Sequence, residues 1–195
     1  MSVPQYSLLN QSGVSYTCRV SSTLNRDTKQ FGKKYLFDGQ NETCWNSDQV
    51  NNNRVICLKF NSLWFKGSPQ WVSLEFEQQV SVSAFSLQFQ GGFVGKECEV
   101  ETEGSNRILE FFPEDSNKFQ TFHLKERVDR LKKIRFAFNS SSDFYGRITI
   151  YKLELYPWKP SQYLGCDCDY LCCLLTFPLN DHPNTFKTSA IDSIT

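Results

Sequence analysis

Apolar and polar residues alternate in short runs through the middle of the chain. The segment 69–76, "PQWVSLEF", alternates in this way, and so does 80–90, "VSVSAFSLQFQ". Within the second segment the apolar positions shift by one residue between Ala84 and Phe85. A period of two indicates a strand with one buried face, and a one-residue shift is typical of a β-bulge. We therefore predict two strands here, the second of them bulged.

Further runs of this kind follow, and turn-forming residues separate them. The runs are 107–112, 119–124, 132–139 and 147–156. The separating segments include Gly91-Gly92, "PEDSN" at 113–117 and "SSSDFYG" at 140–146, which are rich in turn formers. Repeated short strands with turns between them predict an all-β, antiparallel sandwich or barrel.

Length and charge narrow the class of protein. At 195 residues the chain has room for one ordinary domain with appendages. Lys plus Arg equals Asp plus Glu at 21 each, so no net charge draws the protein to nucleic acid or to an anionic membrane. No apolar run approaches the roughly 20 residues that span a bilayer, and the N-terminus lacks a secretory signal pattern. We expect a protein of the nucleus and/or cytoplasm with reduced cysteines.

Catalytic motifs are missing from the sequence. Its two histidines, His123 and His182, accompany no nucleophile motif, and His123 alternates with apolar neighbours as a solvent-facing strand residue would. Glu114 and Asp115 adjoin each other in "PEDSN", where carboxylates are usually solvated. We predict a protein that is not an enzyme.

Several segments together resemble a known family. "RVSSTLN", "LFDGQNETCWNS", "PQWVSLEF", "VSAFSLQFQGG" and "GRITIYKLELY" occur in the order in which the discoidin, or coagulation-factor type C, domain has such segments. The resemblance spans about residues 19–156 and implies a jelly-roll β-sandwich of the galactose-binding-like class. We therefore expect a discoidin-like sandwich over 14–157, a flexible N-terminus over 1–13, and a poorly ordered cysteine-rich tail over 158–195.

A narrower resemblance concerns function. "RVSSTLNRDTKQFGKKYLFD", "ETCWNSDQ", "FFPED" and "DFYGRITIY" resemble a small intracellular family of discoidin-like proteins that associate with orphan nuclear receptors. This implies a non-enzymatic repressor that reduces receptor binding to DNA response elements and does not itself bind nucleic acid. The alternative is a glycan or phospholipid binder, as secreted discoidin relatives are, and a third use of the fold is substrate recruitment in a ubiquitin ligase.

The family resemblance also places the candidate binding residues. Discoidin-like domains bind through hairpin tips at one end of the barrel, which implies tips at 23–34 and 90–97 here. The expected partner-binding residues are Arg26, Phe31, Lys33, Lys34, Phe93 and Val94. An apolar tip with a basic rim suits protein binding, because the aromatic supplies buried area and the cations orient the partner. Whether Phe31 is exposed or tucked into the barrel stays open.

The loop "LFDGQNETCWNS" has a structural and a functional interpretation. The structural interpretation assigns loop-building roles to Asp38, Gly39, Trp45 and Trp71. In it the indole of Trp45 is buried and polar side chains satisfy backbone amides. The functional one is a calcium loop using Asp38, Asn41 and Thr43, but the regular acidic spacing of an EF-hand is missing. We favour the structural role and expect no cofactor or metal.

Two segments depart from the family pattern. The insert 50–68 is too apolar for an ordinary surface loop; it is either an extra hairpin or the product of reading through a splice donor, which we favour. The tail 158–195 has clustered thiols, at Cys166, Cys168, Cys172 and Cys173. A metal site, palmitoylation of Cys172 and Cys173, or an unstructured tail would each account for them, and we favour the last.

Overall fold

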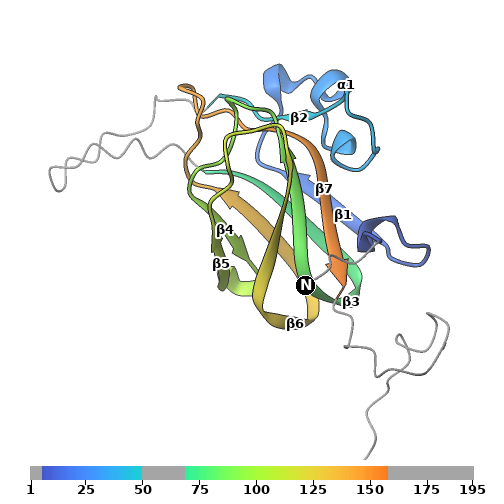
Figure 1. Ribbon diagram of the computed structural model, residues 1–195. Coiled ribbons are helices and arrows are strands. Elements are labelled where there is room, and N and C mark those ends of the chain that lie inside the picture. The colour runs from blue at the N-terminus through green and yellow to red at the C-terminus, as the bar shows by residue number, and fades with distance from the viewer. Residues whose placement is uncertain (1–5, 50–68, 158–195) are drawn as a thin grey trace, which may run out of the picture. The chain divides into compact units, whose positions relative to one another are not determined.

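The computed structural model describes residues 6–49 and 69–157. The insert 50–68 and the cysteine-rich tail 158–195 lie outside these residues, so the predictions about them stay predictions. The regular structure of the described part consists mainly of antiparallel strands (Figure 1). They are β1 (Tyr16–Val20), β2 (Trp45–Asn46), β3 (Gln70–Phe89), β4 (Cys98–Glu101), β5 (Arg107–Phe111), β6 (Phe119–Phe138) and β7 (Thr149–Pro157).

Short helical turns occupy several connections. They are η1 (Leu8–Asn10), η2 (Leu24–Arg26), α1 (Thr28–Phe31), η3 (Lys33–Leu36) and η4 (Glu103–Ser105). Three of them, η2, α1 and η3, follow one another between β1 and β2 and cover one end of the strands (Figure 1). The all-β prediction is therefore confirmed.

Two long strands give the fold its two layers. β3 and β6 pair along both of their halves, as Leu74 with Ile134 and Phe85 with Phe122 show. Both strands bend in the middle, so that each contributes one half to each layer. The first half of β3 pairs with β1, and its second half pairs with β7. The second half of β6 pairs with β4, which pairs with β5, and β2 pairs with β7. This arrangement is a jelly-roll sandwich, as the resemblance implied.

The bend corrects one expectation from the sequence. The segments 69–76 and 80–90 are one strand, β3, and the segments 119–124 and 132–139 are likewise one strand, β6. Their polar middles, such as Glu77 to Gln79, are exposed and resemble a turn in sequence. Pairing nevertheless continues across them through register shifts. One of these falls between Val82 and Ala84, just before the predicted bulge position, whereas Ala84 and Phe85 themselves pair in regular register. The pattern of one segment does not reveal that its partner strand bends at the same place.

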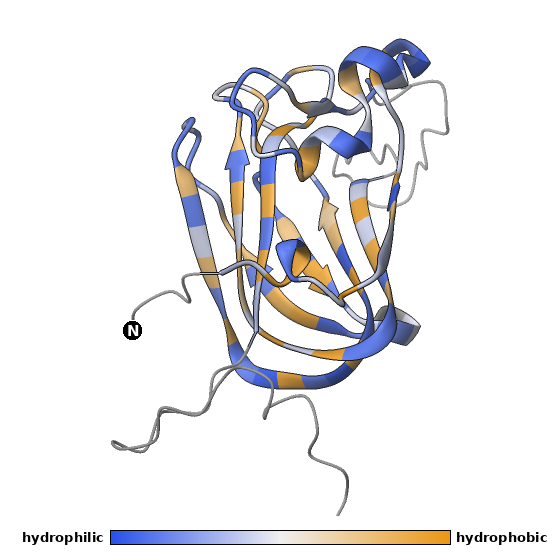
Figure 2. Cartoon of the chain, turned by 90° about the vertical axis from the view of Figure 1, so that its right-hand side faces the viewer, coloured by the Kyte–Doolittle hydropathy of each residue, from blue (hydrophilic) through white to orange (hydrophobic). Residues whose placement is uncertain are grey.

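The core lies between the layers and is rich in phenylalanine. Phe85 is fully buried, with its ring centroid 5.0 Å from that of Phe111, 5.3 Å from Phe122 and 4.9 Å from Phe136. Figure 2 shows hydrophobic and hydrophilic residues alternating along the strands, as a sheet with one buried face requires. The aromatic content of the sequence is therefore used to fill the space between the layers.

The N-terminal segment differs from its prediction. Leu8 and Leu9 belong to residues 1–13, where a flexible N-terminus was expected, but both are buried in the core. Ser7 is buried as well, and its Oγ accepts hydrogen bonds from Leu9 N and Leu155 N, each at 3.4 Å. The sandwich therefore begins before residue 14, because this segment covers the apolar side of β7.

Candidate partner-binding site

Four connections that the structure describes in full meet at one end of the sandwich. β3 and β6 both begin and finish there, as the pairings of Gln70 with Phe138 and Gln88 with Phe119 show. The connections at this end are 21–44, 90–97, 112–118 and 139–148. Both predicted hairpin tips belong to this end, which carries α1 in Figure 1. The candidate site is therefore sought here.

The loop 36–49 is folded onto the sandwich. The carboxylate of Asp38 accepts a hydrogen bond from Gln40 N at 3.0 Å and another from Thr43 Oγ1 at 2.6 Å. Gly39 has a φ of +71°, which glycine adopts without strain. Trp45 is fully buried, and its Nε1 donates to Ser22 O at 3.0 Å. Both carboxylate oxygens of Asp38 thus serve the loop itself.

The first predicted tip is built around α1. Asp27 begins this helix, and its Oδ1 accepts hydrogen bonds from Lys29 N at 3.0 Å and Gln30 N at 3.1 Å. Arg26 is exposed and has a φ of +57°, a left-handed conformation that is costly for a residue with a side chain. Phe31 is partly buried, so it is neither fully exposed nor fully tucked into the barrel.

The helix forms one wall of an open groove of about 680 Å³, here called the α1 groove. Arg19 and Val20 of β1 and Trp71 of β3 form the other side. The remaining lining residues come from the α1 region and are Thr23, Thr28, Lys29, Gly32, Lys33 and Lys34. Trp71, expected to be a purely structural residue, is half-buried in this wall, with the Arg135 guanidinium 4.9 Å from its ring centroid.

The second predicted tip contains one surface residue and one core residue. Phe93 is half-buried, with the Arg147 guanidinium 4.9 Å from its ring centroid. Val94 is only 1% exposed, and its backbone N donates to Ser142 Oγ at 2.9 Å. The expectation that Val94 contacts a partner is therefore wrong. After Gly91-Gly92 the chain turns back into the sandwich, so that only Phe93 stays near the surface.

An exposed aromatic pair lies beside Phe93 and was not predicted. Phe144 is 89% exposed and Tyr145 is 54% exposed, and their rings contact each other edge to face with centroids 5.3 Å apart. The Arg147 guanidinium lies 5.6 Å from the Tyr145 ring centroid, so that it bridges Phe93 and this pair. We call Phe93, Phe144 and Tyr145 the aromatic tip. Two aromatics within the turn-forming segment "SSSDFYG" were the sequence signal for it.

Asp143 holds the aromatic tip in shape. Its carboxylate accepts hydrogen bonds from Tyr145 N and Arg147 N, at 3.2 and 3.1 Å. It also accepts from Arg147 Nε at 3.0 Å and from Nη2 at 3.1 Å. Burial raises the pKa of Asp143, but the hydrogen bonds and charge of Arg147 outweigh burial and hold the pKa below its ordinary value.

We expect Asp143→Asn to lower the free energy of unfolding by about 1–3 kcal/mol at pH 7, because the variant loses the charged partner of Arg147. The folded-state pKa lies below the unfolded value, so the carboxylate stabilises fully above about pH 4 and stops doing so as pH falls through the lowered pKa. Urea unfolding across pH should therefore show the two proteins converging in acid. The control is Glu126→Gln, which changes an exposed carboxylate and should have the free energy of unfolding of the parent at each pH. A difference in the free energy of unfolding between the Asp143 variant and the parent that stays constant across pH would contradict this account.

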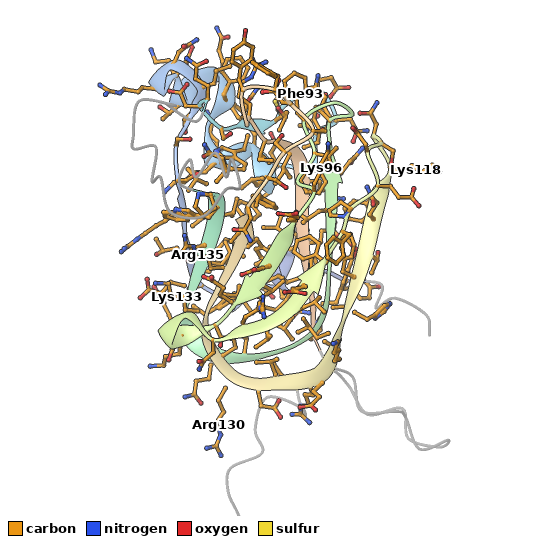
Figure 3. All side chains as sticks on the ribbon, turned by 90° about the vertical axis from the view of Figure 1, so that its left-hand side faces the viewer. Phe93, Lys96, Lys118, Arg130, Lys133 and Arg135 are labelled. Carbon is orange, nitrogen blue, oxygen red and sulfur yellow. The ribbon has the colours of Figure 1, made fainter. Side chains whose placement is uncertain are left out.

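The predicted tip residues thus fall on two separate surfaces. Lys33 and Lys34 line the α1 groove, whereas Phe93 belongs to the aromatic tip. Figure 3 shows Phe93 and Lys96 near this end of the sandwich and Arg130 at the opposite end. The tip predicted at 23–34 is a wall of a basic groove, and the tip predicted at 90–97 contributes Phe93 to an aromatic surface.

Two features were considered for catalysis, His123 and the "PEDSN" turn. His123 is exposed on β6, opposite Ala84. Asp115 Oδ1 accepts a hydrogen bond from Gly92 N at 2.7 Å, and Asn117 Oδ1 accepts one from Gly91 N at 2.6 Å. The "PEDSN" turn therefore anchors the glycine turn. Within 6–49 and 69–157, no group of three or more His, Cys, Asp or Glu is placed to hold a metal ion.

Comparison with known proteins identifies the family. The chain is 47% identical over 141 residues to the nuclear receptor 2C2-associated protein of Danio rerio, which covers 70% of this chain and 87% of that protein. The Homo sapiens protein of the same name is 45% identical over 142 residues, covering 70% and 88%. This chain belongs to the nuclear receptor 2C2-associated protein family.

Other comparisons agree with this family at the level of the fold. No family model matches the sequence. Among solved structures, an F5/8 type C domain from Bacteroides fragilis has a TM-score of 0.58 at 14% identity, covering 75% of this chain and 93% of that one. A family 32 carbohydrate-binding module from C. perfringens, in complex with galactose, has a TM-score of 0.53 at 18% identity, covering 72% and 93%. At such identities the likeness shows the discoidin-like fold alone.

The sequence resembled discoidin-like proteins that associate with nuclear receptors. The match to the nuclear receptor 2C2-associated proteins and the discoidin-like fold confirm this resemblance. In the part of the chain that the structure describes, no helix is long and apolar enough to cross a membrane.

Proposed function

We propose that this protein is a non-enzymatic binding module of the nucleus and/or cytoplasm that associates with an orphan nuclear receptor and represses it by reducing receptor binding to DNA response elements. The observation that carries the proposal is the 45–47% identity to proteins named as associated with nuclear receptor 2C2. A glycan-binding role has only the fold behind it, because the carbohydrate-binding modules are distant in sequence.

The receptor contact is proposed to lie at the α1 end of the sandwich. The proposed contributing residues are Arg26, Phe31, Lys33, Lys34 and Phe93, to which we add Phe144 because it is exposed. Phe144 has the features of a contact residue, because it is 89% exposed on a loop that the Asp143–Arg147 ion pair holds in place. An aromatic anchor whose loop is already ordered loses little conformational freedom on binding.

The test is a pull-down and a mobility-shift assay with purified nuclear receptor 2C2 and the full chain. We expect the chain to bind the receptor and to reduce the amount of receptor on response-element DNA. The variant Arg26→Glu/Phe144→Ala should bind about tenfold more weakly, because it removes an anchor and reverses a charge. The control Lys125→Glu/Lys132→Glu, with exposed β6 residues changed, should bind as the parent does.

Each result has a separate meaning. Absence of receptor binding by the parent chain would overturn the proposed association. Binding without any loss of the receptor–DNA complex would overturn the repression mechanism and leave the association standing. If the Arg26→Glu/Phe144→Ala variant bound the receptor as tightly as the parent chain, the α1 end would not be the contact surface.

A further inference from the structure

The α1 groove concentrates positive charge on a protein with no net charge. Arg19, Lys29, Lys33 and Lys34 all line it, and its lining includes no carboxylate. The whole chain carries equal numbers of acidic and basic residues, so this concentration is local. The carboxylate of Asp27, next to the groove lining, is occupied by the Lys29 and Gln30 amides at the start of α1. The groove is therefore complementary to an anionic ligand.

Two of the four cations of the α1 groove, Lys33 and Lys34, are held in place by the fold. Lys33 Nζ donates a hydrogen bond to Cys18 O at 2.5 Å, which ties η3 to β1. Lys34 Nζ lies 4.7 Å from the ring centroid of Tyr35. A Cβ on Gly32 would lie 2.3 Å from Thr28 O, so only glycine lets the chain pass from α1 directly into the two lysines. Ordered cations lose less side-chain freedom when a ligand binds.

The groove also has an apolar wall. Trp71 is half-buried, and together with Val20 it offers an apolar surface among the cations. Arg135 covers part of the indole and pairs with Glu101 at 3.4 Å, so its charge is already engaged. Free phosphate or a purely polar anion would leave the Trp71 wall uncovered. A peptide with both carboxylates and an apolar side chain would use the whole groove.

We propose that the α1 groove binds an acidic segment of a partner protein, with its carboxylates paired to Arg19, Lys29 and Lys34 and an apolar side chain packed on Trp71. This inference rests on the proposed role as a protein-binding module, and it adds the chemistry of the partner.

The chain itself contains one competing occupant. The insert 50–68 carries Arg54, Lys59 and Lys66 and no Asp or Glu. Its positive charge is therefore repelled by the positive charge of the groove. The C-terminal tail, in contrast, has Asp167 and Asp169 next to Tyr170, which is the chemistry the groove accepts. The experiment therefore has to separate an external acidic peptide from this tail.

The probe is a fluorescein-labelled synthetic peptide of alternating Glu and Leu with a central Phe, titrated into the full chain and followed by fluorescence anisotropy. We expect binding that weakens as salt is raised, because exposed charges are screened. Lys29→Glu/Lys34→Glu should weaken binding about tenfold. The matched control Lys96→Glu/Lys118→Glu reverses two exposed cations outside the groove, labelled in Figure 3, and should bind as the parent does.

Four outcomes overturn the proposal. One is no binding of the acidic peptide by the parent, and another is equal loss in the control, which would mean nonspecific attraction. A third is a gain of several-fold in peptide affinity on Asp167→Asn/Asp169→Asn in the full chain, which would make the tail the natural occupant. A fourth is preference of the groove for duplex DNA over the peptide. Peptide binding that depends on Lys29 and Lys34, without receptor binding, would support the groove and reject only the proposed function.

Discussion

Replacing Trp45 by alanine should lower the free energy of unfolding by about 3–5 kcal/mol, as for other buried tryptophans. The indole is fully buried, and its Nε1 is hydrogen-bonded to Ser22 O at 3.0 Å. It joins the loop 36–49 to the segment that precedes α1, so the variant leaves a cavity and frees both. Chemical denaturation followed by circular dichroism measures the change, and Tm should fall by about 2–4 °C per kcal/mol.

The variant Trp45→Phe separates packing from hydrogen bonding. It keeps a buried aromatic ring but loses the Nε1 donor and part of the indole volume, and we expect a smaller cost of about 1–3 kcal/mol. A cost below about 1 kcal/mol for Trp45→Ala would show that the loop is not integrated with the sandwich. The α1 groove would then also lose its rigid frame, because α1 lies between β1 and this loop.

Replacing Phe85 by alanine should be about as damaging, at about 3–5 kcal/mol. Phe85 has no exposed surface and contacts Phe111, Phe122 and Phe136, which come from β5 and from both halves of β6. Each such aromatic contact adds about 0.5–1.5 kcal/mol beyond burial. The same denaturation measurement applies, and the loss should appear as a lower midpoint with an unchanged slope.

Two variants control for this result. Phe85→Leu retains much of the volume and should cost about 1–2 kcal/mol. Phe112→Ala removes the same ring from the residue just after β5, where it is 68% exposed, and should change stability by less than about 0.5 kcal/mol. Similar losses for Phe85→Ala and Phe112→Ala would contradict the placement of the aromatic core between the layers.

These stability variants bear on function because the candidate surfaces depend on the core. The α1 groove takes its walls from β1, β3 and the α1 region, and the aromatic tip comes from the connections that follow β3 and precede β7. A loss of partner binding in Trp45→Ala would therefore report a disturbed frame. Surface variants such as Lys29→Glu/Lys34→Glu change charge without touching the core, so a loss of binding in them reports the contact itself.

The sequence by itself determined the fold class, the family and the turn and buried tryptophan of the loop 36–49. Period-two alternation in segments such as 147–156 reports a buried face locally, and strand β7 occupies 149–157. Asp38 and Trp45 also act within their own neighbourhood, through a turn and a bulky apolar side chain, and so their positions follow from residue chemistry.

Only the tertiary structure decided how these pieces meet. β3 and β6 are each continuous because the two strands bend together and stay paired. The sequence of one strand does not show how its partner bends. Val94 is buried although it follows a glycine turn, because Ser142 from a distant loop fixes its backbone. The α1 groove joins Arg19 and Lys34 to Trp71. The pairing of β1 with β3 brings Arg19 near Trp71, and the hydrogen bond from Lys33 Nζ to Cys18 O holds η3 against β1. Alternation is a local property, whereas register and contact depend on partners far along the chain, and for that reason the binding surfaces could not be predicted from pattern alone.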